Sequence, residues 1–114
     1  MLFRSHAPGG RERLIEDAKA LEEAGAFAIV VEGVPADLAA TITSLVSVPT
    51  IGIGAGVGCD GQVLVLHDVL GLSESTFRFT KHYAGLRAAA VTATQDYVRE
   101  VRDGSWPDDD HSFH

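Results

Sequence analysis

Glu32 is the residue of this chain that its sequence context places best for acid–base chemistry. It follows the apolar run Phe27–Val31 directly and precedes Gly33. In folds that alternate strands with helices, side chains at the C-terminal ends of strands build the active site. A carboxylate that is partly withdrawn from water there can act as a general base. The same glutamate could instead stabilise the start of a following helix through the helix dipole, and position alone slightly favours that structural role.

A glycine-rich stretch, Gly54–Gly61, resembles a nucleotide-binding loop at first sight, but its spacing is wrong. The last glycine of a dinucleotide fingerprint would fall on Val57 if counted from Gly52, and on Cys59 if counted from Gly54. A phosphate-binding P-loop is excluded because the required lysine is missing. The glycines could let a substrate approach the backbone closely. A tight turn at the end of a strand is the favoured interpretation.

Possible metal ligands occur at Asp60 and at the adjacent pair His67 and Asp68. Three such donors could hold an ion in principle, but neighbours in a strand point apart. Helix capping and loop hydrogen bonds are therefore the favoured roles. The tail Asp108–His114 is typical of a solvated terminus. We predict no metal site, and we interpret Cys59 as an inert small residue because no histidine is placed beside it.

The elements that must position these residues follow from the hydrophobic periodicity. Short apolar runs that alternate with helical patterns predict parallel α/β architecture with strands buried on both faces. No helix separates the second strand from the third, so a short glycine-rich crossover would have to connect that parallel pair. The expected elements are a helix over about 11–24, a strand over 27–31, a helix opened by Pro35, strands over 50–53 and 63–66, helical character from Thr76, and a longer helix over about 87–103 that ends at Gly104.

Three strands are too few for a closed (β/α)₈ barrel, which needs eight strands and about 250 residues. The periodicity alone leaves two alternatives open. One is a small three-stranded open sandwich, and the other is a piece of a barrel.

Composition narrows the class of protein. The chain has 114 residues, 46% of them hydrophobic, and a net charge of −7, so one small globular domain is expected. An acidic chain lacks the clustered cations that bind nucleic acid or anionic membranes. No apolar run is long enough to cross a bilayer, and residues 1–10 lack the apolar core of a signal peptide. The single cysteine excludes an intrachain disulfide, and a cytoplasmic location is expected.

Several segments together resemble the ketopantoate hydroxymethyltransferase family. Their order and spacing agree with the family from about Arg11 to the last residue, whereas residues 1–10 show no likeness. The segments are Asp17–Ala26, Val31–Pro35, Pro49–Gly56, Asp60–Asp68 and His111–Phe113.

The resemblance implies a fold and a division of the chain. The family fold is a (β/α)₈ TIM barrel, related to the phosphoenolpyruvate/pyruvate enzymes, that assembles into large homo-oligomers. The strands of this chain would be the last three of that barrel. Residues 1–10 would then be an unmatched segment, residues 11–104 the C-terminal part of the barrel, and residues 105–114 an acidic tail.

The resemblance also implies a reaction. The family transfers a hydroxymethyl group from 5,10-methylenetetrahydrofolate to 3-methyl-2-oxobutanoate, giving 2-dehydropantoate for pantothenate and coenzyme A synthesis. A Mg²⁺ ion chelates the keto acid and acidifies the carbon next to its carbonyl. Glu32 matches the catalytic glutamate, the proton acceptor, so the resemblance reverses the interpretation from position alone. Ile53, Val63 and Val65 match apolar positions near the isopropyl group of the substrate.

The main departure from the family concerns the metal. The aspartates that ligate Mg²⁺ lie in the first half of the family barrel, and no segment here resembles their motifs. The chain alone is therefore expected to be inactive, to self-associate, and to need a complementing N-terminal half. Two alternatives stay open: a stand-alone, non-catalytic β/α binding domain, and a non-functional gene remnant. An upstream reading frame that encodes a barrel half would favour the transferase.

Overall fold

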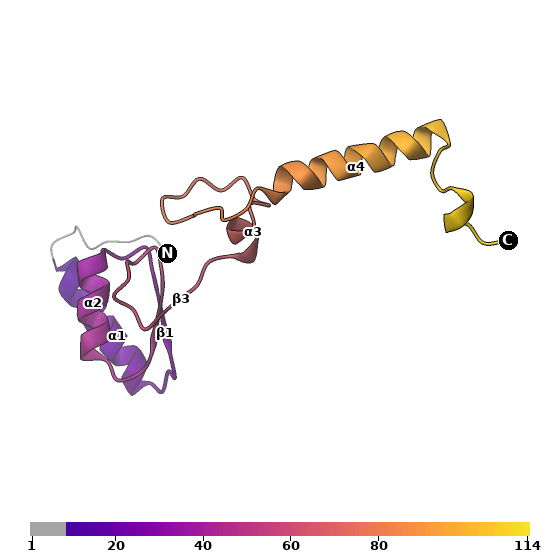
Figure 1. Cartoon of the computed structure of the whole chain (residues 1–114). Helices are drawn as coiled ribbons and strands as arrows, with labels where there is room; N and C mark the ends of the chain where they lie inside the picture. Colours follow the sequence, from indigo (N-terminus) through magenta and orange to yellow (C-terminus); the bar gives the residue numbers. More distant parts are fainter. Residues whose placement is uncertain (1–8) are drawn as a thin grey trace. The chain divides into compact units, whose positions relative to one another are not determined.

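A computed structural model describes residues 9–114 of the chain. Most of the segment 1–10 that was predicted to be unmatched therefore lies outside the described residues. The chain divides into two compact units, one that ends at Leu64 and one that runs from Val65 to His114. Figure 1 shows both units and labels most of their helices and strands.

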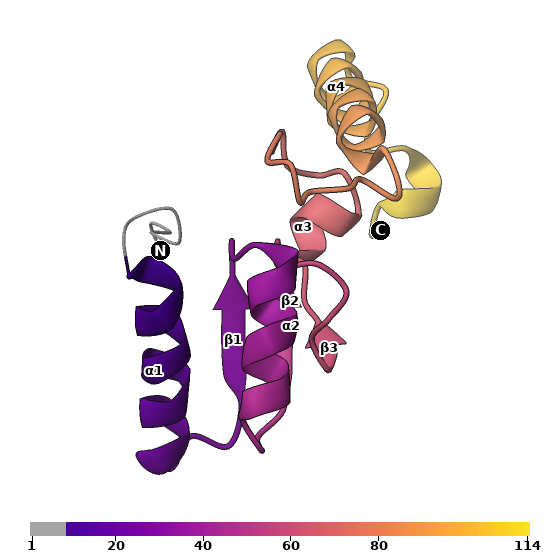
Figure 2. The same ribbon diagram turned by 90° about the vertical axis from the view of Figure 1, so that its left-hand side faces the viewer.

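The first unit is a small parallel β/α structure, as the alternation of patterns predicts. Its three strands have the order β1-β2-β3, and both strand pairs are parallel. Figure 2 shows the strands following one another across the sheet. The glycine-rich loop between β2 and β3 is the crossover that this parallel pair requires. The elements are α1 (Gly10–Glu23), β1 (Ile29–Glu32), α2 (Ala36–Leu45), β2 (Thr50–Ile53) and β3 (Gly61–Gln62).

Both helices of this unit cover the same face of the sheet (Figure 1). Ala18 of α1 and Leu38 of α2 join one hydrophobic core with Ile29 and Val31 of β1. Strand β1 therefore alternates between buried and exposed residues, and Val30 is 60% exposed. The expectation that β1 would be buried on both faces is wrong for this unit, because no described element of the unit covers its second face.

The predicted third strand, over residues 63–66, is also wrong. Strand β3 is shorter and earlier, and Leu66 instead begins α3 (Leu66–Val69). The reason is the length of the partner strand. Ile51 pairs with Gly61, so only two residues of β2 remain beyond that pair. Val63 still donates its N–H to the Gly52 carbonyl, at 2.9 Å, and the chain then leaves the sheet.

The second unit contains α3, α4 (Leu86–Asp103) and the 3₁₀ turn η1 (Asp109–His111). The longer helix confirms the prediction for about 87–103, and Gly104 ends it in a left-handed conformation with φ of 83°. Helical structure from Thr76 is wrong, because residues 76–85 are irregular. That stretch is rich in aromatic and β-branched residues, which are weak helix formers.

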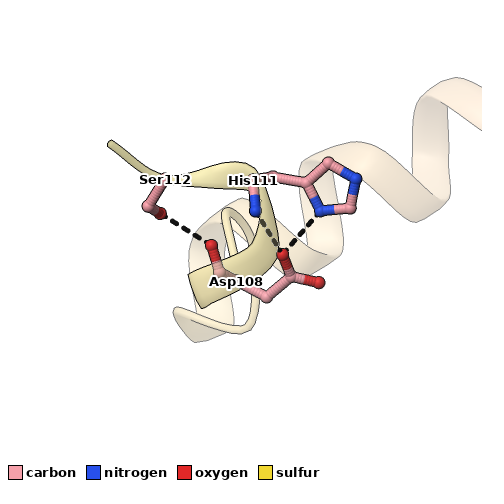
Figure 3. Close-up of polar contacts among 3 residues, drawn as sticks. All are labelled: Asp108, His111 and Ser112. Carbon is pink, nitrogen blue, oxygen red and sulfur yellow. Dashed lines mark hydrogen bonds and ion pairs between the residues drawn. The ribbon is translucent and has the colours of Figure 1, made fainter. Parts of the chain in front are cut away.

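The acidic tail forms a local turn, drawn in Figure 3. Asp108 accepts hydrogen bonds from the backbone N–H of His111, at 3.0 Å, and pairs with its ring Nδ1 at 2.5 Å. The Ser112 hydroxyl donates to the Asp108 carbonyl at 2.6 Å. The Trp106 ring lies 4.7 Å from the His111 ring, centroid to centroid.

Across residues 9–114, no helix has the length and apolar character that crossing a membrane requires.

Candidate functional site

Glu32 is the last residue of β1, so it lies at the C-terminal end of the strand, as the sequence predicts. Its side chain is exposed and, like that of Val30, lies on the face of the sheet opposite the helices, because Ile29 and Val31 take the buried positions. Glu32 therefore presents its carboxylate on the uncovered face of the sheet.

Two of the predicted substrate-binding residues share this face with Glu32. The parallel register pairs Glu32 with Ile53, and paired residues project to the same side. Continuing the β2–β3 register by one residue places Val63 beside Ile53, and Val63 is 47% exposed. We call Glu32, Ile53 and Val63 the strand-end row. A carboxylate beside two branched apolar side chains suits a ligand with an acidic C–H next to a small branched hydrocarbon group.

Val65, the fourth predicted site residue, is not part of the sheet. It belongs to the second compact unit, where its carbonyl accepts hydrogen bonds from Asp68 and Val69 at the start of α3. Val65 thus belongs to a different unit from the strand-end row, and its role near the substrate stays a prediction.

Gly33 positions Glu32, a role that the sequence alone did not indicate. It adopts a left-handed conformation, with φ of 64°, and donates its N–H to the Ile53 carbonyl at 3.0 Å. Glycine takes this conformation without the penalty that a Cβ atom causes. The chain can therefore turn into Pro35 and α2 directly after the catalytic candidate. Once the turn is known, a glycine that follows a strand-end glutamate is the signal that could have indicated this role.

The glycine-rich loop packs tightly on α2. A Cβ atom at Gly56 would lie 2.4 Å from the Ala36 Cβ, and one at Gly58 would lie 2.8 Å from the Ala40 Cβ. The loop begins at the same end of the sheet as Glu32. The glycines at 56 and 58, however, serve the close approach to α2.

The candidate metal ligands make loop hydrogen bonds. Asp60 accepts from the Thr50 backbone N–H at 2.9 Å, and the buried Asp68 accepts from the Ser73 hydroxyl. Within residues 9–114, no group of three or more His, Cys, Asp or Glu side chains could hold a metal ion. The donors in the described part of the chain therefore do not fit a Mg²⁺ site.

An apolar groove of about 480 Å³ runs between α1 and β1. Its walls include Leu14 and Leu21 of α1 and Val30 of β1, and Glu32 borders it. The groove follows the side of β1 that has no neighbour among the described strands. It lies beside the strand-end row.

Comparison with known proteins gives a consistent result. Residues 3–109 match the family model described as ketopantoate hydroxymethyltransferase. A relative from Trichlorobacter lovleyi, named 3-methyl-2-oxobutanoate hydroxymethyltransferase, is 57% identical over 90% of this chain and 39% of its own length. Relatives of the same name from Moorella thermoacetica and Pyrobaculum calidifontis are 58% and 55% identical, over 96% and 89% of this chain and 40% and 38% of their own lengths. The chain thus spans about two fifths of the length of these relatives.

Proposed function

The chain belongs to the ketopantoate hydroxymethyltransferase family, and from this premise we propose that it supplies the general base and an apolar substrate wall for the reaction of that family. The reaction is transfer of a hydroxymethyl group from 5,10-methylenetetrahydrofolate to 3-methyl-2-oxobutanoate, giving 2-dehydropantoate in pantothenate and coenzyme A synthesis. In this proposal the sheet is the C-terminal part of a (β/α)₈ barrel. The observation that supports it is the strand-end row of Glu32, Ile53 and Val63.

Each residue of the strand-end row has its own role in the proposed reaction. The Glu32 carboxylate accepts the proton from the carbon next to the keto group. The electron pair left on that carbon forms the new C–C bond to the one-carbon unit. The bonds from that unit to the two folate nitrogens break, water supplies the hydroxyl oxygen, and tetrahydrofolate leaves. Ile53 and Val63 contact the isopropyl group of the keto acid and contribute to its binding. Because the described residues do not fit a Mg²⁺ site, the Mg²⁺ that the resemblance implies would need ligands from the region of the relatives that this chain does not span.

The proposed partners follow from the length of the chain relative to its relatives. The chain spans 39% of its Trichlorobacter relative, so we propose that it acts with a complementing N-terminal half, within a homo-oligomer. The proposed compartment is the cytoplasm, which fits the single cysteine.

Exchange of the C3 proton of 3-methyl-2-oxobutanoate for deuterium tests this proposal, because that partial reaction needs no folate. We expect no Mg²⁺-dependent exchange from a polypeptide of these 114 residues. A chimera that carries the N-terminal region of the Trichlorobacter relative before the matched region should catalyse exchange. In the chimera, Glu32→Gln should slow exchange by about 10²–10⁴-fold, the usual contribution of a general base.

Glu23→Gln is the matched control, because Glu23 is an exposed glutamate at the end of α1. It should leave exchange unchanged. An unchanged rate in the Glu32→Gln chimera would remove Glu32 from the mechanism. Robust exchange by the 114-residue polypeptide, lost on Glu32→Gln, would show that the complementing half is not required.

A further inference from the structure

The crossover from β2 to β3 raises the question of what holds it in place. Parallel strands are usually joined by a dozen or more residues that include a helix. Here β2 ends at Ile53 and β3 begins at Gly61, and no helix lies between them. The register of β3, and with it the position of Val63, must therefore depend on contacts that the loop itself makes.

A reciprocal pair of hydrogen bonds closes this loop. The Asp60 carboxylate accepts from the Thr50 backbone N–H at 2.9 Å, and the Asp60 N–H donates to the Thr50 hydroxyl at 3.2 Å. We call this pair the Thr50–Asp60 clasp. It joins the first residue of β2 to the residue directly before β3.

Thr50 is the buried half of the clasp, whereas Asp60 is exposed. Thr50 is fully buried, and its hydroxyl also lies 2.8 Å from the Thr43 hydroxyl of α2. Thr43 in turn donates to the Ala39 carbonyl at 2.8 Å. Buried polar groups without partners lose stability. The network therefore ties the crossover to α2 as well as to β2.

The side chains of Cys59 and Gln62 pack between the loop and β2. A Cβ atom at Gly52 would lie 3.0 Å from the Cys59 Sγ and 3.3 Å from the Gln62 amide nitrogen, so both side chains pack closely on this glycine. The Gln62 amide donates to the Gly56 carbonyl at 2.8 Å. Cys59 is half-buried against Gly52 of β2, precedes Asp60 in the chain, and is the only cysteine of the chain.

We propose that Asp60 is a positioning residue for the substrate site, which it serves by fixing Val63. The clasp sets β3 in register with β2, and the next residue, Val63, then donates its N–H to Gly52 and stands beside Ile53. Asp60 contacts no substrate and acts through the apolar wall. This inference rests on the proposed function, because the wall matters only if the row binds the keto acid.

The clasp itself can be tested in the 114-residue chain, with Cys59 as the reporter. Asp60→Ala should raise both the rate at which a thiol reagent labels Cys59 and the hydrogen-exchange rate of the Val63 amide by at least about tenfold, as expected when a hydrogen bond to a charged group is lost. Asp60→Asn keeps an acceptor for the Thr50 N–H and should retain most of the protection. The control is Glu16→Ala, an equal charge change on the exposed side of α1.

If Asp60→Ala does not fold, Thr50→Val replaces it. That variant keeps the shape of the side chain and removes its hydroxyl, the partner of the Asp60 N–H and of the Thr43 hydroxyl, so the same rates should rise. Unchanged labelling and exchange rates in the folded Asp60 or Thr50 variant would overturn the clasp.

The positioning role is tested in the chimera by steady-state kinetics. Asp60→Ala should raise KM for 3-methyl-2-oxobutanoate about tenfold with little change in kcat, because the wall is displaced while Glu32 is not. Val63→Ala should have a similar effect. The double variant should be no worse than either single variant, because both changes remove the same contact.

These results separate the two hypotheses. A chimera without activity in its parent form would contradict the proposed function, while Cys59 labelling and Val63 exchange would still decide whether Asp60 fixes Val63. An active chimera in which Asp60→Ala leaves KM unchanged, or in which the two substitutions multiply in their effects, would overturn the positioning role alone.

Discussion

Among single residues, Gly58 has a backbone that lies unusually close to a helix. A Cβ atom there would lie 2.8 Å from the Ala40 Cβ and 3.1 Å from its Cα, so α2 or the loop must move to admit it. We predict that Gly58→Ala lowers the free energy of unfolding by about 1–3 kcal/mol, the usual cost of overpacking. Urea unfolding measures this change.

Gly61→Ala is the matched control for Gly58→Ala, because no atom lies within 4 Å of a Cβ atom there. It should leave the free energy of unfolding nearly unchanged. Equal unfolding midpoints for the two variants would mean that the loop does not rest on α2 as described.

Some features of the candidate site can be predicted from the sequence, and others cannot. The place of Glu32 at a strand end could be predicted because an apolar run ends directly before it, whereas its catalytic role is implied only by the family resemblance. The hydrogen bonds of Asp60 could not be predicted, because its partner Thr50 is ten residues away and is recognised only when the crossover folds back on β2. The packing of Gly56 and Gly58 on α2 is equally invisible in the spacing of the glycines.

Helices α1 and α2 are joined by one ion pair, and this gives the first unit a dependence on pH. The Arg11 guanidinium donates to the Asp37 carboxylate at 2.9 Å, and this hydrogen bond holds the pKa of Asp37 below its ordinary value. A lowered pKa in the folded state means that the stabilisation is fully present above the ordinary aspartate pKa, about 4. It is lost as the pH falls through the lowered value.

We therefore predict that Asp37→Asn reduces stability slightly at neutral pH and has no effect in strong acid. The reduction is small because both partners are exposed and screened by solvent. Urea midpoints of the variant and the parent chain at neutral and acidic pH measure it, with Glu16→Gln as the control. A larger difference in acid than at neutral pH would contradict the assigned sign.

The elements were predictable where one segment's own pattern decides them. A helical periodicity of apolar residues or a short apolar run lies within a single segment. The elements α1, α2, α4 and β2 have such patterns, and they form where expected. Strand β3 depends on its partner, since β2 leaves no backbone to pair with Val65 or Leu66. The burial of β1 depends on what covers each face of the sheet, which no local pattern records.

Among the described residues of the first unit, none covers the outer edge of β1 or the second face of the sheet. Ile29 and Gly33 donate their N–H groups toward β2. The backbone N–H and C=O groups of successive residues in a strand point to alternate sides. Those of Val30 and Glu32 therefore point away from β2. That side of β1 has no neighbour among the described strands, and the apolar groove beside α1 runs along it. An open edge beside apolar surface favours pairing with another chain.

We therefore predict that the 114-residue polypeptide self-associates in solution. Sedimentation velocity over a range of concentrations should show species larger than a monomer. Val30→Lys should weaken association about tenfold, because a side chain that is 60% exposed in the single chain would otherwise be buried at the contact. Val57→Lys, at a valine that is 95% exposed in the glycine-rich loop, is the control and should leave association unchanged. A sharp monomeric profile with cooperative unfolding would refute this prediction. It would favour the alternative of a stand-alone binding domain, because such a domain is stable without a second chain paired along the free edge of β1.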